Sequence, residues 1–218
     1  SMTPITALGS RYGIQGALGR SVKRASTATE VEISMQDGDL TTLIVSAPTR
    51  CYGQFCAIRG ATLMRYDVSS LSSAVLSAKI VFTRTNTITA VKTYNSIFYG
   101  LASANAGWVS QSSKPAASGI CCWNAKEADG SGGVTTAWAG SAGCQTAGTD
   151  YINTAIGTLT YYRAGTSGTT YELVFNNDGI ALVNSWISNS ANNYGIMTPN
   201  QEFSAVTMDP YPPLIVTY

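Results

Sequence analysis

The chain has 218 residues, of which 44% are hydrophobic and only 11% are charged, and its net charge at pH 7 is +1. Average soluble proteins carry roughly 25% charged residues, and helix surfaces are rich in Lys and Glu, so this composition argues against a helical protein. The small net charge gives no field that would attract nucleic acid or an acidic membrane surface. Histidine is absent from the sequence, which excludes Ser-His-Asp and Cys-His catalysis and histidine metal sites.

The first 29 residues differ in charge from the rest of the chain. They contain no carboxylate and four cations, which are Arg11, Arg20, Lys23 and Arg24. They are also rich in Gly and poor in periodic apolar residues, so we expect a basic arm that builds no core layer of its own. Two interpretations of residues 1–29 stay open: an arm that docks on a neighbouring molecule, and a leader without a role. The predicted organisation is an arm at 1–29 and one domain at 30–218.

From residue 30 onward, many short strand patterns are separated by Gly, Ser and Asn turns. They alternate apolar and polar residues or are rich in β-branched and aromatic residues, and they cover 31–35, 63–68, 78–83, 91–99, 158–162, 171–175, 194–197, 213–218 and, more weakly, 42–45. One amphipathic helix is expected at 177–188, with Asn177 as its N-cap. No apolar run approaches the roughly 20 residues that span a bilayer. The expected fold is an all-β, antiparallel jelly-roll β-sandwich with one short helix.

Five cysteines lack the paired CxxC spacing of a zinc site. Cys51 and Cys56 flank a short loop that a disulfide would close, and Cys144 could pair with Cys121 or Cys122 across a Gly-rich stretch. Two disulfides would fit an oxidising, extracellular compartment. The alternative is five small buried residues in a reducing cell.

Three groups of short motifs follow one another along the domain. They are Leu63–Ser70 with Ala78-Lys79-Ile80; then Trp108, Cys122-Trp123-Asn124, Trp138-Ala139-Gly140 and Asp150-Tyr151; then Val183–Trp186, Asn193-Tyr194-Gly195, Phe203-Ser204 and Pro213–Tyr218. In this order they resemble the DNRLRE-type module, a jelly-roll β-sandwich of bacterial and archaeal surface proteins, some of whose members are classed as carbohydrate-binding modules. Cys122 departs from the usual Thr, and residues 1–29 have no counterpart. The resemblance implies a sandwich fold and a non-enzymatic role, without a particular ligand.

Tyrosines on strands are the candidates for a ligand site, because the apolar face of a pyranose stacks on an aromatic ring. Adjacent strand residues point to opposite faces, so at least one of Tyr161 and Tyr162 faces outward or into a groove, and the neighbouring Arg163 is a candidate ligand residue with them. Tyr94 and Tyr99 are further candidates. The four tryptophans lie at motif positions, and we expect them in the core.

We expect neither a cofactor nor catalysis. Glycoside cleavage needs a carboxylate pair, and no spacing among the twelve acids singles one out. Asp37-Gly38-Asp39 and Asp129-Gly130 resemble fragments of calcium loops, although Asp-Gly is foremost a turn signal, so no metal site is assigned and a structural calcium stays an alternative.

The favoured function is a non-catalytic binding or attachment module for a polysaccharide or a cell-surface glycan. The alternative is a structural subunit of a virion, as a decoration or appendage protein, or of a surface filament. Such a subunit would assemble with copies of itself, or with capsid or filament neighbours, through residues 1–29 and open sheet edges. Both hypotheses place the protein outside the cell, on its surface or on a virion, and neither involves nucleic acid.

Overall fold

The structure is a computed structural model that describes residues 30–33, 45–46, 59–109, 118–121, 124–131, 133–202, 206, 208 and 212–217. The strands within them are β1 (Glu30–Ile33), β2 (Val45–Ser46), β3 (Arg59–Met64), β4 (Ser77–Thr83), β5 (Thr93–Leu101), β6 (Glu127–Ala128), β7 (Val134–Thr136), β8 (Tyr151–Tyr162), β9 (Thr170–Val174), β10 (Ile196–Glu202) and β11 (Leu214–Thr217). The described residues also form one helix, α2 (Asn177–Ser188), and two 3-10 turns, Ser103–Asn105 and Ser190–Asn192.

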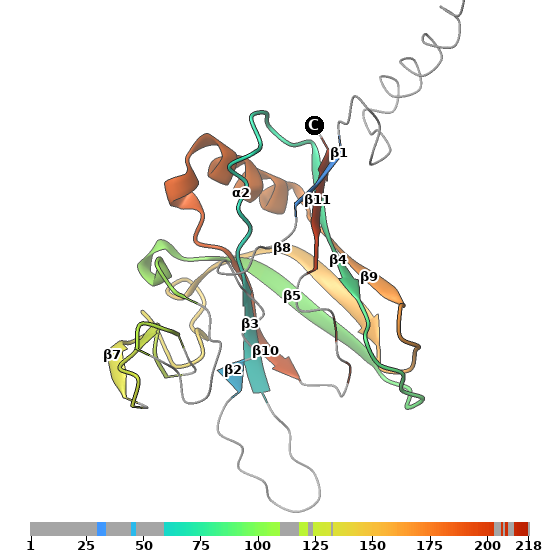
Figure 1. Ribbon diagram of the computed structural model, residues 1–218, viewed down its shortest axis with the longest axis horizontal. Helices are drawn as coiled ribbons and strands as arrows, with labels where there is room; N and C mark the ends of the chain where they lie inside the picture. The colour runs from blue at the N-terminus through green and yellow to red at the C-terminus, as the bar shows by residue number, and fades with distance from the viewer. Residues whose placement is uncertain are drawn as a thin grey trace, which may run out of the picture.

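Two antiparallel sheets form the body of the fold (Figure 1). One has the strand order β1-β11-β4-β9 and the other the order β2-β3-β10-β5-β8, while β6 and β7 pair as a small hairpin. Every strand pair in the described residues is antiparallel. The prediction of an all-β, antiparallel fold with one short helix is therefore confirmed, and the sheets are arranged like a sandwich. The finer expectation of a jelly roll stays a prediction.

The main core lies between the two sheets. In β4, buried and half-buried residues alternate along the strand, so one face packs inward. The four-stranded sheet contributes Ala78, Ile80, Phe82, Tyr171, Leu173, Leu214 and Val216, and the five-stranded sheet contributes Met64, Phe98, Ile156, Leu159, Tyr161 and Ile196. Since residues far apart in the sequence fill this layer, its side chains tie the two sheets into one unit.

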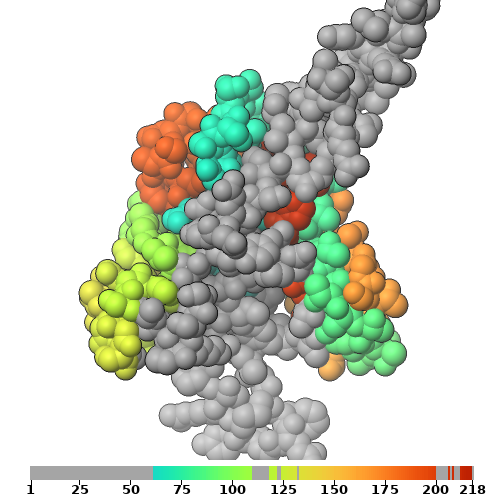
Figure 2. Space-filling model, viewed as in Figure 1, coloured from blue at the N-terminus to red at the C-terminus, as the bar shows by residue number. Residues whose placement is uncertain are grey.

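A second core lies on the opposite face of the five-stranded sheet. Its members include Ala61 and Leu63 of β3, which alternate with Met64 of the main core, and Trp108, Trp138, Cys121 and Cys144 from the irregular region after β5. In Figure 2, the green and yellow residues of this region gather in one lobe, away from β4 and β9. Trp108, Trp138 and Trp186 are all buried, as expected, whereas Trp123 lies outside the described residues.

The helix α2 spans the predicted residues 177–188, but its N-cap is Asn176 and not Asn177. The Asn176 side chain accepts a hydrogen bond from the Gly179 backbone N–H at 3.0 Å, which satisfies one of the open donors of the first turn. Val183 and Trp186 bury the apolar face of the helix. In the part of the chain that the structure describes, no helix is long and apolar enough to cross a membrane.

Several strand boundaries differ from the predicted ones, and β10 runs over Ile196–Glu202 where 194–197 was expected. β3 ends at Met64, so the segment 65–68 is not strand, and the Arg65 guanidinium lies 5.2 Å from the centre of the Trp108 ring. β8 begins at Tyr151 and is therefore seven residues longer at its start than the predicted 158–162. The hairpin of β6 and β7 was not expected, because two- and three-residue strands leave no periodicity to detect.

The predicted disulfide of Cys144 with Cys121 or Cys122 is wrong in this structure. Cys144 and Cys121 are thiols, both fully buried in the second core. The Cys144 sulfur accepts a hydrogen bond from the Asn105 side-chain amide at 3.4 Å, so it behaves as a small core residue with a polar partner. Cys51, Cys56 and Cys122 lie outside the described residues, as do residues 1–29 and Asp37-Gly38-Asp39.

The Asp129-Gly130 segment is a turn. The Asp129 carboxylate accepts hydrogen bonds from the backbone N–H groups of Ser131 and Gly133 at 2.7 and 2.9 Å. These bonds, the first of which is the largest contribution, lower the pKa of the Asp129 carboxyl. An aspartate that binds its own backbone two and four residues onward fits the turn interpretation of this sequence.

Candidate functional site

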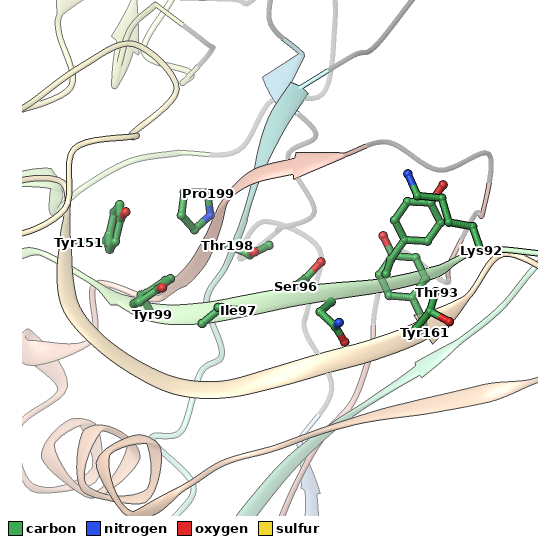
Figure 3. A pocket seen from close by; sticks show the side chains of 11 residues that line it. Lys92, Thr93, Ser96, Ile97, Tyr99, Tyr151, Tyr161, Thr198 and Pro199 are labelled. Carbon is green, nitrogen blue, oxygen red and sulfur yellow. The ribbon is translucent and has the colours of Figure 1, made fainter.

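The site begins where β10 separates from β5. The two strands pair at only two positions, Ile196 opposite Gly100 and Met197 opposite Tyr99. Beyond Met197, β10 continues along β3 with a bulge between Thr198 and Gln201. β5 meanwhile continues along β8 as far as Thr93 opposite Tyr162. A groove therefore opens within the five-stranded sheet, between β5 and β10 (Figure 3).

This β5–β10 groove encloses about 500 Å³. Its lining is polar and aromatic: Lys92, Thr93, Tyr94, Asn95, Ser96, Ile97 and Tyr99 from β5 and the residue before it, Tyr151 and Tyr161 from β8, and Thr198 and Pro199 from β10. Figure 3 shows Lys92 and Tyr161 at one end, Tyr99 and Tyr151 at the other, and Ser96 and Thr198 between them. The groove is thus elongated along β5.

A pair of tyrosines stands at each end of the groove. Tyr94 and Tyr161 are stacked, with ring centres 5.3 Å apart, and the Lys92 ammonium lies 4.7 Å from the centre of the Tyr94 ring. Tyr99 and Tyr151 lie 4.8 Å apart at an angle of 43°. Five residues of extended chain separate Tyr94 from Tyr99, which is about 15–17 Å. That distance exceeds a single sugar ring. The first pair packs against the main core and the second pair against the second core, on the opposite face of the five-stranded sheet, so a ligand that reaches both pairs must be extended and must pass between β5 and β10.

The backbone of β5 also faces the groove. The Arg163 N–H donates to the Lys92 carbonyl at 2.7 Å, so Lys92 and Arg163 form a hydrogen-bonded pair of the antiparallel ladder between the two chain segments. Every second residue of β5 bonds to β8, so the N–H and C=O groups of Thr93, Asn95 and Ile97 point to the other edge, toward β10. Among the described residues no strand pairs with this edge before Tyr99. It therefore offers a row of donors and acceptors to a ligand.

The Tyr151 end of the groove is held by the neighbouring Asp150. The buried Asp150 carboxylate accepts hydrogen bonds from the Asn105 side-chain amide and from the backbone N–H groups of Gly140, Ser141 and Thr146, all between 2.8 and 3.0 Å. Burial by itself would raise the pKa of Asp150, but the Asn105 bond and the three backbone bonds outweigh it and lower that pKa. A fixed carboxylate at the first residue before β8 positions Tyr151.

The electrostatic environment keeps the Tyr151 hydroxyl protonated. Burial is the largest cause that raises the pKa of Tyr151, and the nearby Tyr99, Asp150 and Cys144 add to it. A protonated phenol both donates and accepts a hydrogen bond, which suits the hydroxyl groups of a neutral or acidic sugar.

Three of the five ligand-site residues expected from the sequence lie together in the groove. These are Tyr94, Tyr99 and Tyr161. Tyr162 does not belong to the groove: it is 54% exposed and its ring lies 6.4 Å from that of Tyr171. Arg163 is half-buried just beyond the end of β8 and is not part of the lining. The alternation of Tyr161 and Tyr162 between faces is therefore as expected, with the inward residue in the groove.

Sequence reasoning did not single out Lys92, Tyr151, Ser96 and Thr198 as site residues. Tyr151 carried a signal, since it stands in the Asp150-Tyr151 motif, and Lys92 lies two residues before Tyr94 on the same face of the strand pattern. Ser96 and Thr198 carried none, because their contact with the groove depends on where β10 leaves β5.

Comparison with known proteins adds no assignment. No protein-family model matches the chain, and no curated protein matches it. The resemblance to the DNRLRE-type module therefore stays a prediction.

Proposed function

We propose that the protein is a non-catalytic binding module whose β5–β10 groove holds an extended glycan. The observation that carries the proposal is the pair of tyrosines at each end of a polar groove. Aromatic residues supply apolar contact area, and few, well-placed polar groups fix the orientation of a ligand. Tyrosine hydroxyls, the exposed Thr93 and Asn95 and the open edge of β5 would meet the sugar hydroxyls.

A binding role without catalysis fits the chemistry of the lining. Glycoside hydrolysis requires two carboxylic acids on opposite sides of the scissile bond. The described residues that line the groove include no Asp or Glu. The described lining therefore offers aromatic and polar groups that can recognise a ligand, and the paired acids of a glycosidase are not among these groups.

The proposal extends to the setting of the protein. The DNRLRE-type resemblance and the neutral, hydroxyl-rich composition favour a module displayed outside the cell, on its surface or on a virion. A jelly-roll topology would complete that resemblance. Polysaccharides and cell-surface glycans are the partners that such a location supplies.

The test is a set of binding measurements on matched tyrosine variants. Glycan microarrays would find the ligand, and isothermal titration calorimetry would measure its affinity. Tyr94→Leu and Tyr99→Leu should each weaken binding about tenfold or more, because each removes one aromatic end of the groove. The control is Tyr162→Leu, which changes an exposed tyrosine of the same strand ladder outside the groove and should bind as the wild type does.

Melting temperatures near the wild-type value would show that these variants are folded. The proposal is overturned if no oligosaccharide binds, or if the two groove variants bind as tightly as the Tyr162 control. A loss in all three variants would place the ligand elsewhere on the Tyr-rich strands.

The open edge of β5 favours a second candidate function, a structural subunit. An exposed strand edge can accept a further strand from a neighbouring chain, which adds main-chain hydrogen bonds to an assembly. Sedimentation velocity over a range of protein concentrations would test this function directly. A monomer at all concentrations, both with residues 1–28 and without them, would argue against it.

A further inference from the structure

The middle of the groove, between its two tyrosine pairs, presents one exposed face of β5. Along this strand the exposed residues Thr93, Asn95 and Ile97 alternate with less exposed neighbours. Since residues two apart share a face, these three lie on the same face of the sheet as Tyr99. Ile97 is 43% exposed, lines the groove and follows Tyr99 at about 6.4–6.8 Å along the strand. A ligand that contacts Tyr99 therefore continues past Ile97 and Asn95.

The side chain of Asn95 is a hydrogen-bond donor with a fixed orientation. The Thr160 hydroxyl, directly opposite on β8, donates to the Asn95 side-chain oxygen at 2.7 Å. This bond occupies the carbonyl end of the amide and sets its direction. Among the described residues, no second hydrogen bond reaches this side chain. The Asn95 NH₂ group, with its two N–H donors, is therefore left for a ligand in the groove.

The backbone at the same place has open donors and acceptors. The outward N–H and C=O groups of Thr93, Asn95 and Ile97 have no partner among the described residues. Figure 3 shows Ile97 on the β5 wall and Pro199 on the β10 wall. Pro199 has no N–H, so that position of β10 cannot donate to the edge of β5. The middle of the groove thus combines a side-chain donor, backbone donors and acceptors, and two apolar residues.

An amide is the group that complements this arrangement. A strand edge pairs with secondary amides, because each carries one N–H donor and one C=O acceptor. Hydroxyl, carboxylate and sulfate substituents of a sugar lack that combination, whereas an acetamido group has it. Its carbonyl oxygen can accept from the Asn95 NH₂ group, its N–H can donate to an outward carbonyl of β5, and its methyl group can contact Ile97.

We propose that the middle of the groove binds the acetamido group of a 2-acetamido sugar, so that the ligand is an N-acetylated polysaccharide. This inference rests on the proposed function, whose substrate class it names. Asn95 is the specificity-determining residue, because it donates to the one atom that a hydroxyl substituent does not supply. Ile97 adds apolar contact with the methyl group, and Tyr99 contacts the ring that carries it.

The experiment compares chitohexaose with cellohexaose by isothermal titration calorimetry. The two ligands have the same length and linkage and differ only in an acetamido group or a hydroxyl group at position 2 of each ring. The wild type should bind chitohexaose about tenfold more tightly or better, because cellohexaose leaves the donors of the site unpaired. In saturation-transfer difference NMR, the acetyl methyl protons of chitohexaose should receive the strongest saturation.

Asn95→Asp separates a role in specificity from a role in the fold. The substitution keeps the shape of the side chain and its bond from Thr160, but it sets an acceptor oxygen against the acetamido carbonyl. Binding of chitohexaose should weaken about tenfold. Binding of cellohexaose should not weaken, since its hydroxyl groups can donate to the carboxylate. A distorted groove would weaken both ligands.

Asn153→Asp is the matched control. It adds the same charge at an exposed asparagine of β8 that does not line the groove, so it should bind both ligands as the wild type does. Ile97→Thr keeps a β-branched side chain and removes apolar contact. It should weaken chitohexaose about threefold and leave cellohexaose unchanged.

The outcomes separate this inference from the proposed function. Equal affinities for the two ligands, or an equal loss in Asn95→Asp and Asn153→Asp, would overturn the acetamido site and leave the glycan groove standing. A glycan-array ligand without an acetamido group, together with no binding of chitohexaose, would do the same. An empty array with neither hexasaccharide bound would overturn both proposals.

Discussion

The side-chain amide of Asn105 donates to the carboxylate of Asp150 at 2.9 Å, across 45 residues of largely irregular chain. The Asn105 carbonyl oxygen in turn accepts the Ala139 N–H at 2.9 Å, and Asp150 accepts the next two N–H groups, of Gly140 and Ser141. Two buried side chains therefore organise the lobe between β5 and β8 in place of a regular ladder of backbone bonds. They also anchor the start of β8, next to Tyr151 of the groove.

Asp150→Asn should destabilise the protein by about 2–4 kcal/mol, because an amide nitrogen would face N–H donors that the carboxylate now accepts. Chemical denaturation followed by tryptophan fluorescence would measure the loss. Asp129→Asn is the matched control: its carboxylate also accepts backbone N–H groups, but at an exposed turn, so its effect should be much smaller. Equal stability of Asp150→Asn and the wild type would contradict the anchoring role.

Acid should destabilise the wild type more steeply than Asp150→Asn. The pKa of Asp150 in the folded protein lies below its usual value, so its contribution is fully present above the unfolded pKa of about 3.9 and is lost as pH falls through the folded pKa. Melting curves between pH 6 and pH 2 would show the two proteins converging at the acid end. Parallel curves over that range would mean that Asp150 does not titrate differently in the two states.

Gly195→Ala should destabilise the fold much more than Gly148→Ala. Both glycines have positive φ angles, +94° and +78°, so each substitution carries a backbone cost of about 1 kcal/mol. At Gly195 a Cβ would also lie 2.5 Å from the Met64 carbonyl oxygen, whereas at Gly148 it would meet nothing within 4 Å. The difference in unfolding free energy between the variants measures the close approach of the chain before β10 to the end of β3. Similar values for both would contradict it.

Cys144 should resist thiol reagents in the native protein. The thiol is buried, and burial, with smaller contributions from Asp150 and Cys121, raises its pKa, so little reactive thiolate is present. Iodoacetamide labelling with peptide mapping should find Cys144 unmodified before unfolding and fully modified after it. A Cys144 peptide joined to another cysteine in protein from its native source would instead restore the disulfide expected from the sequence.

Local patterns predicted the elements well, and the site only in part. The apolar spacing of Ile180, Val183 and Ile187 predicted α2, while the choice between Asn176 and Asn177 as N-cap depended on which side chain could reach Gly179. Strand alternation predicted that Tyr161 and Tyr162 would separate. It could not predict that Tyr161 would meet Tyr94, because that contact follows from the register of β5 with β8.

Long-range contacts account for what the sequence did not reveal. Thr198 belongs to the groove only because β10 leaves β5 after Met197. Cys144 suggested a disulfide by its separation from Cys121 and Cys122, and it does lie in the second core together with Cys121, but both are thiols and the Cys144 sulfur accepts a hydrogen bond from the Asn105 amide. No local sequence pattern could predict either contact, because each depends on segments that meet only in the folded chain.

Because the groove opens inside one sheet, its two walls are fixed by backbone pairing and not by the length of a loop. A shift of β10 by one residue along β3 would turn every β10 side chain to the other face, so gradual widening is not available to this scaffold. Exchanges at positions 92, 93, 95 and 97, whose side chains are exposed, would leave the walls in place and alter only the groups presented to a ligand. A library randomised at those positions would therefore sample new specificities on a constant frame.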